Sequence, residues 1–296
     1  MRRSTALGFG LCGLAMVTVG SAVVASKLIA TGLPPFTAAA LRFAMALPVF
    51  LLLMIPTRGQ LRWPGRRDAG LLLAQAALGS VGYTALLVVG LRFTSAADAG
   101  VVAGTLTAVA GALAILLLGE RPTGRGLLAV ALAGGGIVAV TWDAGGLHPA
   151  PGRTVLLGNA IVLAAVMCEA VFLLLNKRLR LLLPPLAQST AMTGLSLMVA
   201  TPFALLEQPW TTSPDPVALV AVAYYALVPT VAGFLLWYAG AARLTGMQAA
   251  LATAILPVST LVLAAVALGE AIGLAQIVGM LLVLAAIALG ARPSTA

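Results

Sequence analysis

The chain has 296 residues, of which 61% are hydrophobic and 8% are charged, and its mean hydropathy is +1.09. This composition exceeds what the core of a water-soluble protein requires, so it predicts an integral membrane protein. The net charge is +9, but the basic residues stand between apolar runs and are not interleaved with aromatic residues. We therefore expect no nucleic-acid partner.

Ten apolar runs come close to the ~20 residues that a helix needs to cross a bilayer. Gly and Pro inside these runs do not argue against helices, because membrane helices tolerate both. The sequence therefore predicts an all-α integral membrane protein with ten transmembrane helices. The expected spans are 6–26, 36–55, 69–90, 95–118, 126–142, 154–176, 186–206, 217–241, 245–268 and 272–291.

The chain contains an internal repeat with an offset of 150 residues. The framework of the stretch from Lys27 to Pro35 occurs again from Lys177 to Pro185. Two homologous halves, 1–150 and 151–296, follow from it. Each half holds five expected helices, so the second half must enter the membrane from the opposite side, and inverted repeats of this kind are typical of secondary transporters. The other matched pairs are Gly8 with Gly158, Pro64 with Pro214, Gly90 with Gly240, Ser95 with Thr245, and Gly119-Glu120 with Gly269-Glu270.

The first run follows Arg2 and Arg3 and so has features of a cleaved signal peptide. Its counterpart in the second half is internal and cannot be a signal. We therefore expect the first run to be retained as part of the repeat.

The basic residues also predict the orientation. Lys27, Arg92 and Arg153 fall on one side of the expected membrane and Arg42 falls inside a helix, whereas the remaining thirteen of the 17 lie on the side of the N-terminus. The positive-inside preference then places both termini in the cytoplasm. We expect a multi-pass protein of a bacterial-type inner (plasma) membrane, with the lipid bilayer as its solvent.

Several short motifs occur in a fixed order: Val19-Gly20-Ser21, Lys27, Pro34-Pro35, Arg42-Phe43, Leu91 to Ala96, Gly119-Glu120, Trp237-Tyr238, Pro257 and Gly269-Glu270. Together they resemble the drug/metabolite transporter superfamily, in particular its ten-helix EamA-type members, over nearly the whole chain. The resemblance implies a central cavity lined mainly by helices 1, 3, 4, 6, 8 and 9, and export of small metabolites, often amino acids. Val19 stands where that family often has Trp and Thr107 where Pro is common, which implies a wider pocket with hydroxyl groups.

Glu169 is the main candidate for a substrate-binding residue. It lies about seven residues, or roughly 10 Å at 1.5 Å per residue, from the end of its expected helix near Asn176. A carboxylate at such depth is costly and marks a binding or proton site. It could bind a substrate ammonium or take up a proton, and the alternative is a neutral or paired carboxylate that serves packing alone.

Arg42 and Asp98 are the candidate gating residues. They lie about six and about three residues inside their expected helices, both counted from the outer side. Their interaction would close the outer side, and the alternative is two independent residues, with Arg42 extending outward to the interface. Arg42 and Glu169 differ in expected depth by roughly 10 Å across a ~30 Å apolar core, so we do not expect them to pair directly.

Aromatic and uncharged polar side chains complete the candidate site. Tyr83, Trp237 and Tyr238 could stack on a substrate, or could equally anchor or pack helices. Glu120 and Glu270 precede the last helix of each half and are expected to stabilise its N-terminus. Further hydrogen bonds could come from residues that helix contacts would use as readily, namely Gln75, Thr105, Thr107, Gln248 and Ser259.

No catalytic residue, cofactor or metal site is expected. The run from Gly8 to Gly13 fits GxGxxG, but no strand precedes it. His148 is the sole histidine and stands in a loop rich in Gly and Pro, without nearby ligands. Cys12 and Cys168 fall within apolar runs and are expected to be small buried side chains.

These observations predict a secondary transporter rather than an enzyme, a pump or a channel. No nucleophile and base cluster together, the loops leave no room for a nucleotide domain, and inverted halves favour alternating access over a continuous pore. Arg42 is the one cation clearly inside an expected helix, so sugar phosphates fit less well than small zwitterions or weak cations. Amino-acid export is the first expectation, and export of organic cations or multiple drugs, with or without proton coupling, is the alternative. The sequence leaves the oligomeric state open, and a monomer is compatible with it.

Overall fold

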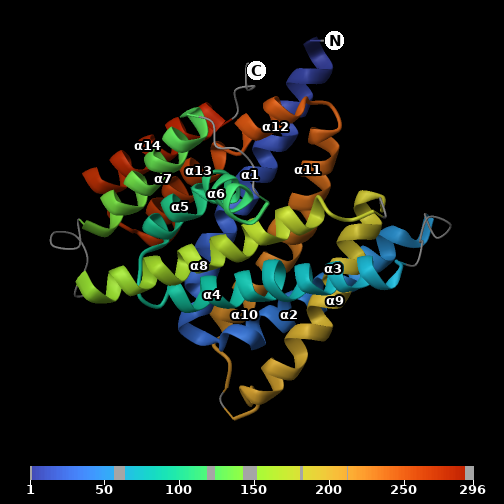
Figure 1. The fold of residues 1–296 in the computed structure, drawn as a ribbon. Coiled ribbons are helices and arrows are strands. Elements are labelled where there is room, and N and C mark those ends of the chain that lie inside the picture. Colours follow the sequence, from blue (N-terminus) through green and yellow to red (C-terminus); the bar gives the residue numbers. More distant parts are fainter. Residues whose placement is uncertain are drawn as a thin grey trace.

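The computed structural model describes residues 2–56, 64–118, 124–142, 152–180, 183–211 and 213–290, and the regular structure within them is helical (Figure 1). The first half contains α1 (Arg2–Gly32), α2 (Pro35–Met54), α3 (Arg66–Gln75), the π-helix η2 (Ala76–Gly82), α4 (Tyr83–Gly90), α5 (Ala96–Gly104), α6 (Leu106–Leu118) and α7 (Gly124–Trp142). The second half contains α8 (Gly152–Asn176), α9 (Pro185–Leu206), α10 (Pro216–Tyr225), the π-helix η3 (Ala226–Ala232), α11 (Gly233–Ala241), α12 (Gly246–Ala252), α13 (Ile255–Leu268) and α14 (Leu274–Gly290).

These helices form the ten expected membrane spans. By length and composition, 7 continuous helical stretches in the described chain can cross a membrane, and the bent pair of α5 and α6 makes up to 8. The other two spans are α12 followed by α13, and α14, in which α13 and α14 are shorter apolar helices. The fold is therefore an all-α membrane fold of two inverted five-helix repeats.

The repeat is visible in the irregular parts of the helices. The π-helices η2 (Ala76–Gly82) and η3 (Ala226–Ala232) occupy equivalent positions at the same offset of 150 residues. A π-helical turn widens the helix and redirects the side chains after it, and such turns are frequent at functional sites. The third span of each half therefore contains a π-helical turn at the same position.

The two halves interlock through equivalent pairs of helices. α2 packs on α9 and α7 on α14, while α4 crosses α8 and α1 crosses α11 (Figure 1). Glycines allow the last two crossings: a Cβ on Gly90 would lie 3.1 Å from the carbonyl oxygen of Gly158, and one on Gly240 would lie 2.9 Å from that of Gly8. The same pairs of repeat positions therefore meet at both crossings.

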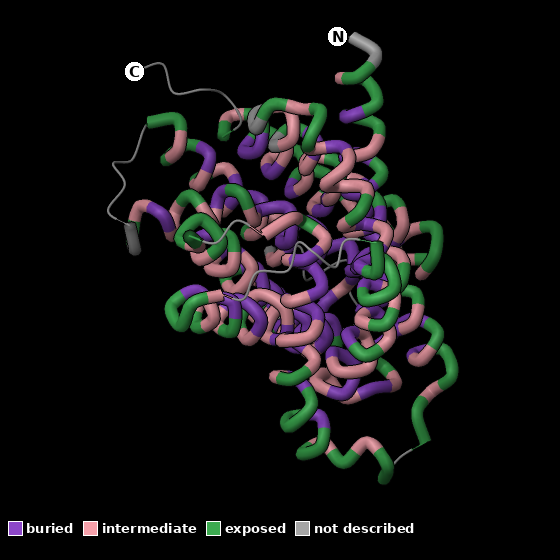
Figure 2. The backbone as a smooth tube through the Cα atoms, turned by 90° about the vertical axis from the view of Figure 1, so that its right-hand side faces the viewer, coloured by how far each residue is buried: buried purple, intermediate pink, exposed green. Residues whose placement is uncertain are grey.

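The burial pattern suits a lipid solvent. Buried residues gather in the middle of the fold and exposed residues lie on its outer faces (Figure 2). Many exposed side chains are large and apolar, for example Val266 at 80% and Leu116 at 76% exposure. Such a surface would be unfavourable in water but is stable against hydrocarbon.

Lys27 lies inside α1 and not in the loop where the sequence placed it, because α1 continues to Gly32. Its ammonium donates hydrogen bonds to the carbonyl oxygens of Leu91 and Thr94, at 2.7 and 2.6 Å. The charge is compensated by the end of α4, so the helix does not need to stop before it.

Glu270 stabilises a different helix from the one expected. Its carboxylate accepts hydrogen bonds from the backbone N–H groups of Ala96 and Ala97, both at 2.8 Å, so it binds the N-terminus of α5 in the other half rather than that of α14. The first N–H groups of any helix lack partners within the helix, and a carboxylate within reach will satisfy them. Glu120 and His148 lie outside the described residues.

Candidate substrate cavity

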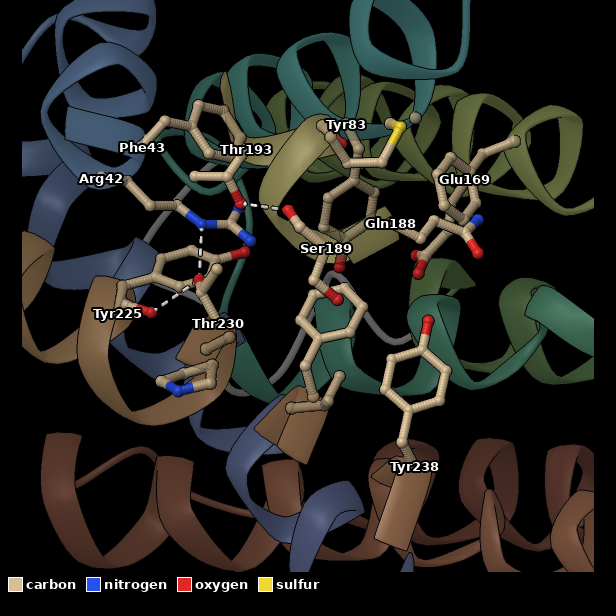
Figure 3. Close-up of a pocket in the computed structure, with 18 residues that line it drawn as sticks. Arg42, Phe43, Tyr83, Glu169, Gln188, Ser189, Thr193, Tyr225, Thr230 and Tyr238 are labelled. Atoms are coloured by element: carbon tan, nitrogen blue, oxygen red, sulfur yellow. Dashed lines mark hydrogen bonds between the residues drawn. The ribbon is translucent and has the colours of Figure 1, made fainter. Parts of the chain in front are cut away.

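A cavity of about 170 Å³ lies between the two halves (Figure 3). Its wall comes from α1, α4, α8, α10, α11 and both π-helices. It also comes from α2 and α9, the second and seventh spans, which the family resemblance did not include. Its polar and aromatic lining residues are Arg42, Phe43, Ser80, Tyr83, Glu169, Phe172, Gln188, Ser189, Thr193, Tyr225, Thr230, Phe234 and Tyr238.

A larger cavity of about 440 Å³ continues from the first and shares Val19, Glu169 and Tyr238 with it. It extends along the end of α8 to Asn176, which is exposed. Because successive spans reverse direction, the end of α8 lies on the side where α1 begins. The joined cavity therefore opens toward the N-terminal side, and Glu169 stands where its two parts meet.

Arg42 is held by one threonine from each half. Its Nε donates to Thr230 Oγ1 at 2.9 Å and its Nη1 donates to Thr84 Oγ1 at 2.7 Å. Both hydroxyls donate in turn to backbone carbonyls: Thr84 donates to Ser80 within η2, and Thr230 donates to Tyr225 just before η3. The guanidinium also lies 4.0 Å from the centre of the Tyr225 ring, a cation–π distance. The cation is thus fixed in position.

Glu169 lies across the same cavity from Arg42 (Figure 3), close enough for electrostatic attraction between them. No hydrogen bond joins the two side chains in the described part of the chain. Counting residues from the helix ends predicts different depths for them, but that count assumes parallel helices. Both side chains nevertheless line the same cavity, so residues of unequal count along α2 and α8 meet in one place.

Asp98 lies elsewhere, fully buried in the first turn of α5. Its Oδ1 accepts a hydrogen bond from Gln276 Nε2 at 2.8 Å, and Lys27 is close enough to attract it electrostatically. The predicted contact between Arg42 and Asp98 is absent from the described chain, because Arg42 turns into the cavity and is held there by threonines. Their gating role stays a prediction.

Four of the remaining candidates line the joined cavity. Tyr83 belongs to the smaller part, Trp237 and Thr107 belong to the larger part, and Tyr238 contacts both. The aromatic groups from α4 and α11 thus surround the space beside Glu169, as stacking on a substrate would require.

Gln248 and Ser259 do not line either part of the cavity. Gln248 Oε1 accepts a hydrogen bond from the backbone N–H of Thr245 at 3.0 Å, which caps the start of α12. Ser259 is buried between α13 and α1, and its hydroxyl donates to the carbonyl of Leu256 at 2.9 Å. Both serve helix geometry in this structure.

Sequence reasoning missed the contribution of α9 to the cavity. Gln188, Ser189 and Thr193 project into the cavity from this helix (Figure 3). A signal was present, since polar residues gathered in an apolar membrane segment tend to face a cavity or another helix. Tyr225 gave no such signal, because a single tyrosine in an apolar run does not indicate which face of its helix is directed to the cavity.

A membrane protein built from two inverted helical repeats around a central polar cavity has the architecture of a secondary transporter. The EamA-like transporter family matches this chain twice, at residues 6–142 and 156–291. The chain belongs to this family, within the drug/metabolite transporter superfamily.

Relatives agree with this assignment. The uncharacterized transporter YetK of Bacillus subtilis (strain 168) is 32% identical over 276 residues, covering 92% of this chain and 83% of that protein. The uncharacterized transporter YyaM of the same organism is 26% identical over 254 residues, covering 84% and 82%. A crystal structure of another protein, 22% identical, matches 98% of this chain and 96% of its own with a TM-score of 0.64, which supports the fold.

Proposed function

We propose that this transporter exports small metabolites, and amino acids in particular, across a bacterial-type inner membrane by alternating access. The observation that carries the proposal is the position of Glu169 on the wall of the central cavity, where the smaller and larger parts join. A carboxylate there can bind the ammonium group that amino acids share. Gln188 and Ser189 line the cavity near it and offer uncharged hydrogen bonds.

The direction of transport follows from the proposed orientation. If both termini are cytoplasmic, as the distribution of basic residues indicates, the cavity in this conformation opens to the cytoplasm. An exporter must collect its substrate on that side. The conformation described is then the loading state of the cycle.

Export of organic cations is the second candidate. Phe172, Phe234 and Tyr238 lie around Glu169 in the cavity, and the rings of Phe234 and Tyr238 stack with centroids 6.0 Å apart. Aromatic faces attract quaternary ammonium groups. A substrate held in this way does not need to carry a carboxylate. This candidate explains the aromatic lining but gives no role to Arg42.

Purified protein in liposomes tests these functions. Vesicles loaded with an amino-acid panel, quaternary amines or sugar phosphates would be assayed for efflux with and without a pH gradient. Efflux of amino acids above that of empty liposomes supports the first function. Efflux confined to quaternary amines supports the second, and efflux of sugar phosphates alone contradicts both.

A further inference from the structure

We propose that Arg42 binds the carboxylate of the substrate while Glu169 binds its ammonium, so that the cavity selects molecules carrying both groups. The inference rests on the proposed function and names the substrate class more narrowly, as small zwitterions. It also gives Arg42 a role in recognition in addition to any part in gating.

The guanidinium has donors available for a ligand. A guanidinium carries five N–H donors, and two groups in the described chain, Thr84 and Thr230, accept from its Nε and Nη1. Its remaining N–H bonds belong to the end that points into the cavity (Figure 3). Two parallel N–H bonds match the geometry of a carboxylate, which a lysine could not reproduce.

The two charges break the repeat in a complementary way. Met192 occupies the position equivalent to Arg42, and Val19 the position equivalent to Glu169, and all four line the same cavity. Each half therefore supplies one charge of opposite sign to one space. A charge inside a membrane protein is costly unless hydrogen bonds or an opposite charge compensate it, and a zwitterion would bring an opposite charge to Arg42 and to Glu169 at once.

The surroundings of Arg42 fix the position of the group that would bind the substrate carboxylate. The threonine bonds and the Tyr225 ring hold the guanidinium from two sides. Arg42 and Glu169 together line only the smaller part of the joined cavity, and that part, at about 170 Å³, is below the ~300–1,000 Å³ typical of sites for drug-sized ligands. A short molecule with its two charged groups close together suits this space better than a bulky drug.

Paired substrates separate the role of Arg42 from that of Glu169. Binding of an amino acid and of the amine that its decarboxylation would give is measured on wild-type protein, Arg42→Gln and Arg42→Lys. In Arg42→Gln we expect about 10- to 100-fold weaker binding of the amino acid, the loss of a charged hydrogen bond, and unchanged binding of the amine. Arg42→Lys should restore only part of the loss.

Arg243→Gln is the matched control, because Arg243 is exposed and lies outside the cavity. Thermal melting in detergent monitors folding of every variant. Equal weakening of amino acid and amine in a folded Arg42→Gln protein would overturn this inference and leave the proposed function standing. A wild-type protein that binds no amino acid would instead overturn the proposed function, and this inference with it.

A separate observation concerns the two lysines of the repeat, and from it we infer that Lys27 and Lys177 exchange roles during transport. Lys27 bonds the carbonyls of Leu91 and Thr94 on the side where the cavity is closed. Lys177 is exposed on the open side, and its ammonium group has no partner among the described residues. In the opposite conformation Lys177 would bind the carbonyls of Ala241 and Leu244, the repeat equivalents, and Lys27 would release its own.

Labelling of Val19→Cys, a cavity position, tests this exchange in a protein whose Cys12 and Cys168 are replaced by alanine. Lys27→Met, and Lys27→Gln as a second variant, should increase labelling from the face opposite the N-terminus by at least about 10-fold, because the conformation closed on that face loses two charged hydrogen bonds. Lys177→Met should decrease it. A folded Lys27 variant labelled no faster than the parent, or equal shifts at both lysines, would overturn the exchange.

Discussion

Three charged residues within the described membrane helices are compensated by different kinds of partner. Lys27 uses backbone carbonyls, Arg42 uses hydroxyls and an aromatic face, and Asp98 uses an amide. Such partners lower the cost of burying charge. Arg42 and Glu169 line the open cavity, where a substrate can reach them, whereas Lys27 and Asp98 do not line it. What surrounds each side chain therefore separates the charges that line the cavity from those held between helices.

The first residue-scale prediction concerns Glu169→Gln, which keeps the shape of the side chain and removes its charge. We expect binding of amino acids and amines to weaken by about 1.5–3 kcal/mol, the range for hydrogen bonds to charged groups. Calorimetry on purified protein measures this loss. If Glu169 instead carries a coupled proton, the variant should lose transport driven by a pH gradient but retain substrate exchange.

Glu207→Gln is the control for this prediction. Glu207 is a carboxylate outside the cavity that accepts hydrogen bonds from Phe36 and Thr37 at the start of α2. Its loss should lower stability without changing the ranking of substrates. Wild-type affinity, rates and pH dependence in a folded Glu169→Gln protein would leave Glu169 a packing residue.

A second residue-scale prediction is that Asp98 couples to Gln276. The hydrogen bond between them is buried at both ends. Either substitution alone removes this hydrogen bond. The effects of Asp98→Ala and Gln276→Leu on the free energy of unfolding should therefore differ from additivity by about 1–3 kcal/mol in the double variant. Unfolding in a denaturing detergent measures the cycle. The cycle between Arg42→Ala and Asp98→Ala should be additive, and coupling there with none to Gln276 would contradict this assignment.

At the scale of the elements, the sequence predicted where helices lie but not where they break. Apolar runs and turn residues placed the ten spans close to their observed bounds, because a bilayer demands long helices with few charges. The 45° bend between α5 and α6 and the π-helices were not predicted. Gly and Pro occur in many of these helices, so Pro229 inside η3 carried no distinct signal.

The element-scale prediction concerns the glycines at the helix crossings. Gly240→Ala would place a Cβ 2.9 Å from the Gly8 carbonyl oxygen and close to Cys12, on backbone that cannot move alone. We expect destabilisation by about 1–3 kcal/mol, the usual cost of overpacking. Gly134→Ala in α7 is the control, since its Cβ would meet nothing within 4 Å. Thermal melting of both variants decides the matter, and equal melting temperatures would contradict the close crossing.

At the scale of the whole molecule, the candidate site was only partly predictable. Glu169 could be identified from one helix, because a deep carboxylate is unusual in any membrane span. That Arg42 shares its cavity depends on how α2 and α8 are placed around it, and that Asp98 meets Gln276 depends on how α5 packs on α14. Such crossings are set by side-chain packing between helices distant in sequence, which a residue count along one helix does not contain.

The last prediction is the orientation of the whole molecule, with the loops around Arg62 and Arg180 in the cytoplasm. Arg62 lies outside the described residues, whereas Arg180 is exposed after α8. Single cysteines at these positions, in a protein lacking its own two cysteines, should resist an impermeant thiol reagent added to intact cells. Gln208→Cys, beyond the opposite end of α9, should react. Because basic residues are held on the cytoplasmic side, the reverse pattern would mean that the cavity described here opens outward and that substrate enters it from outside the cell.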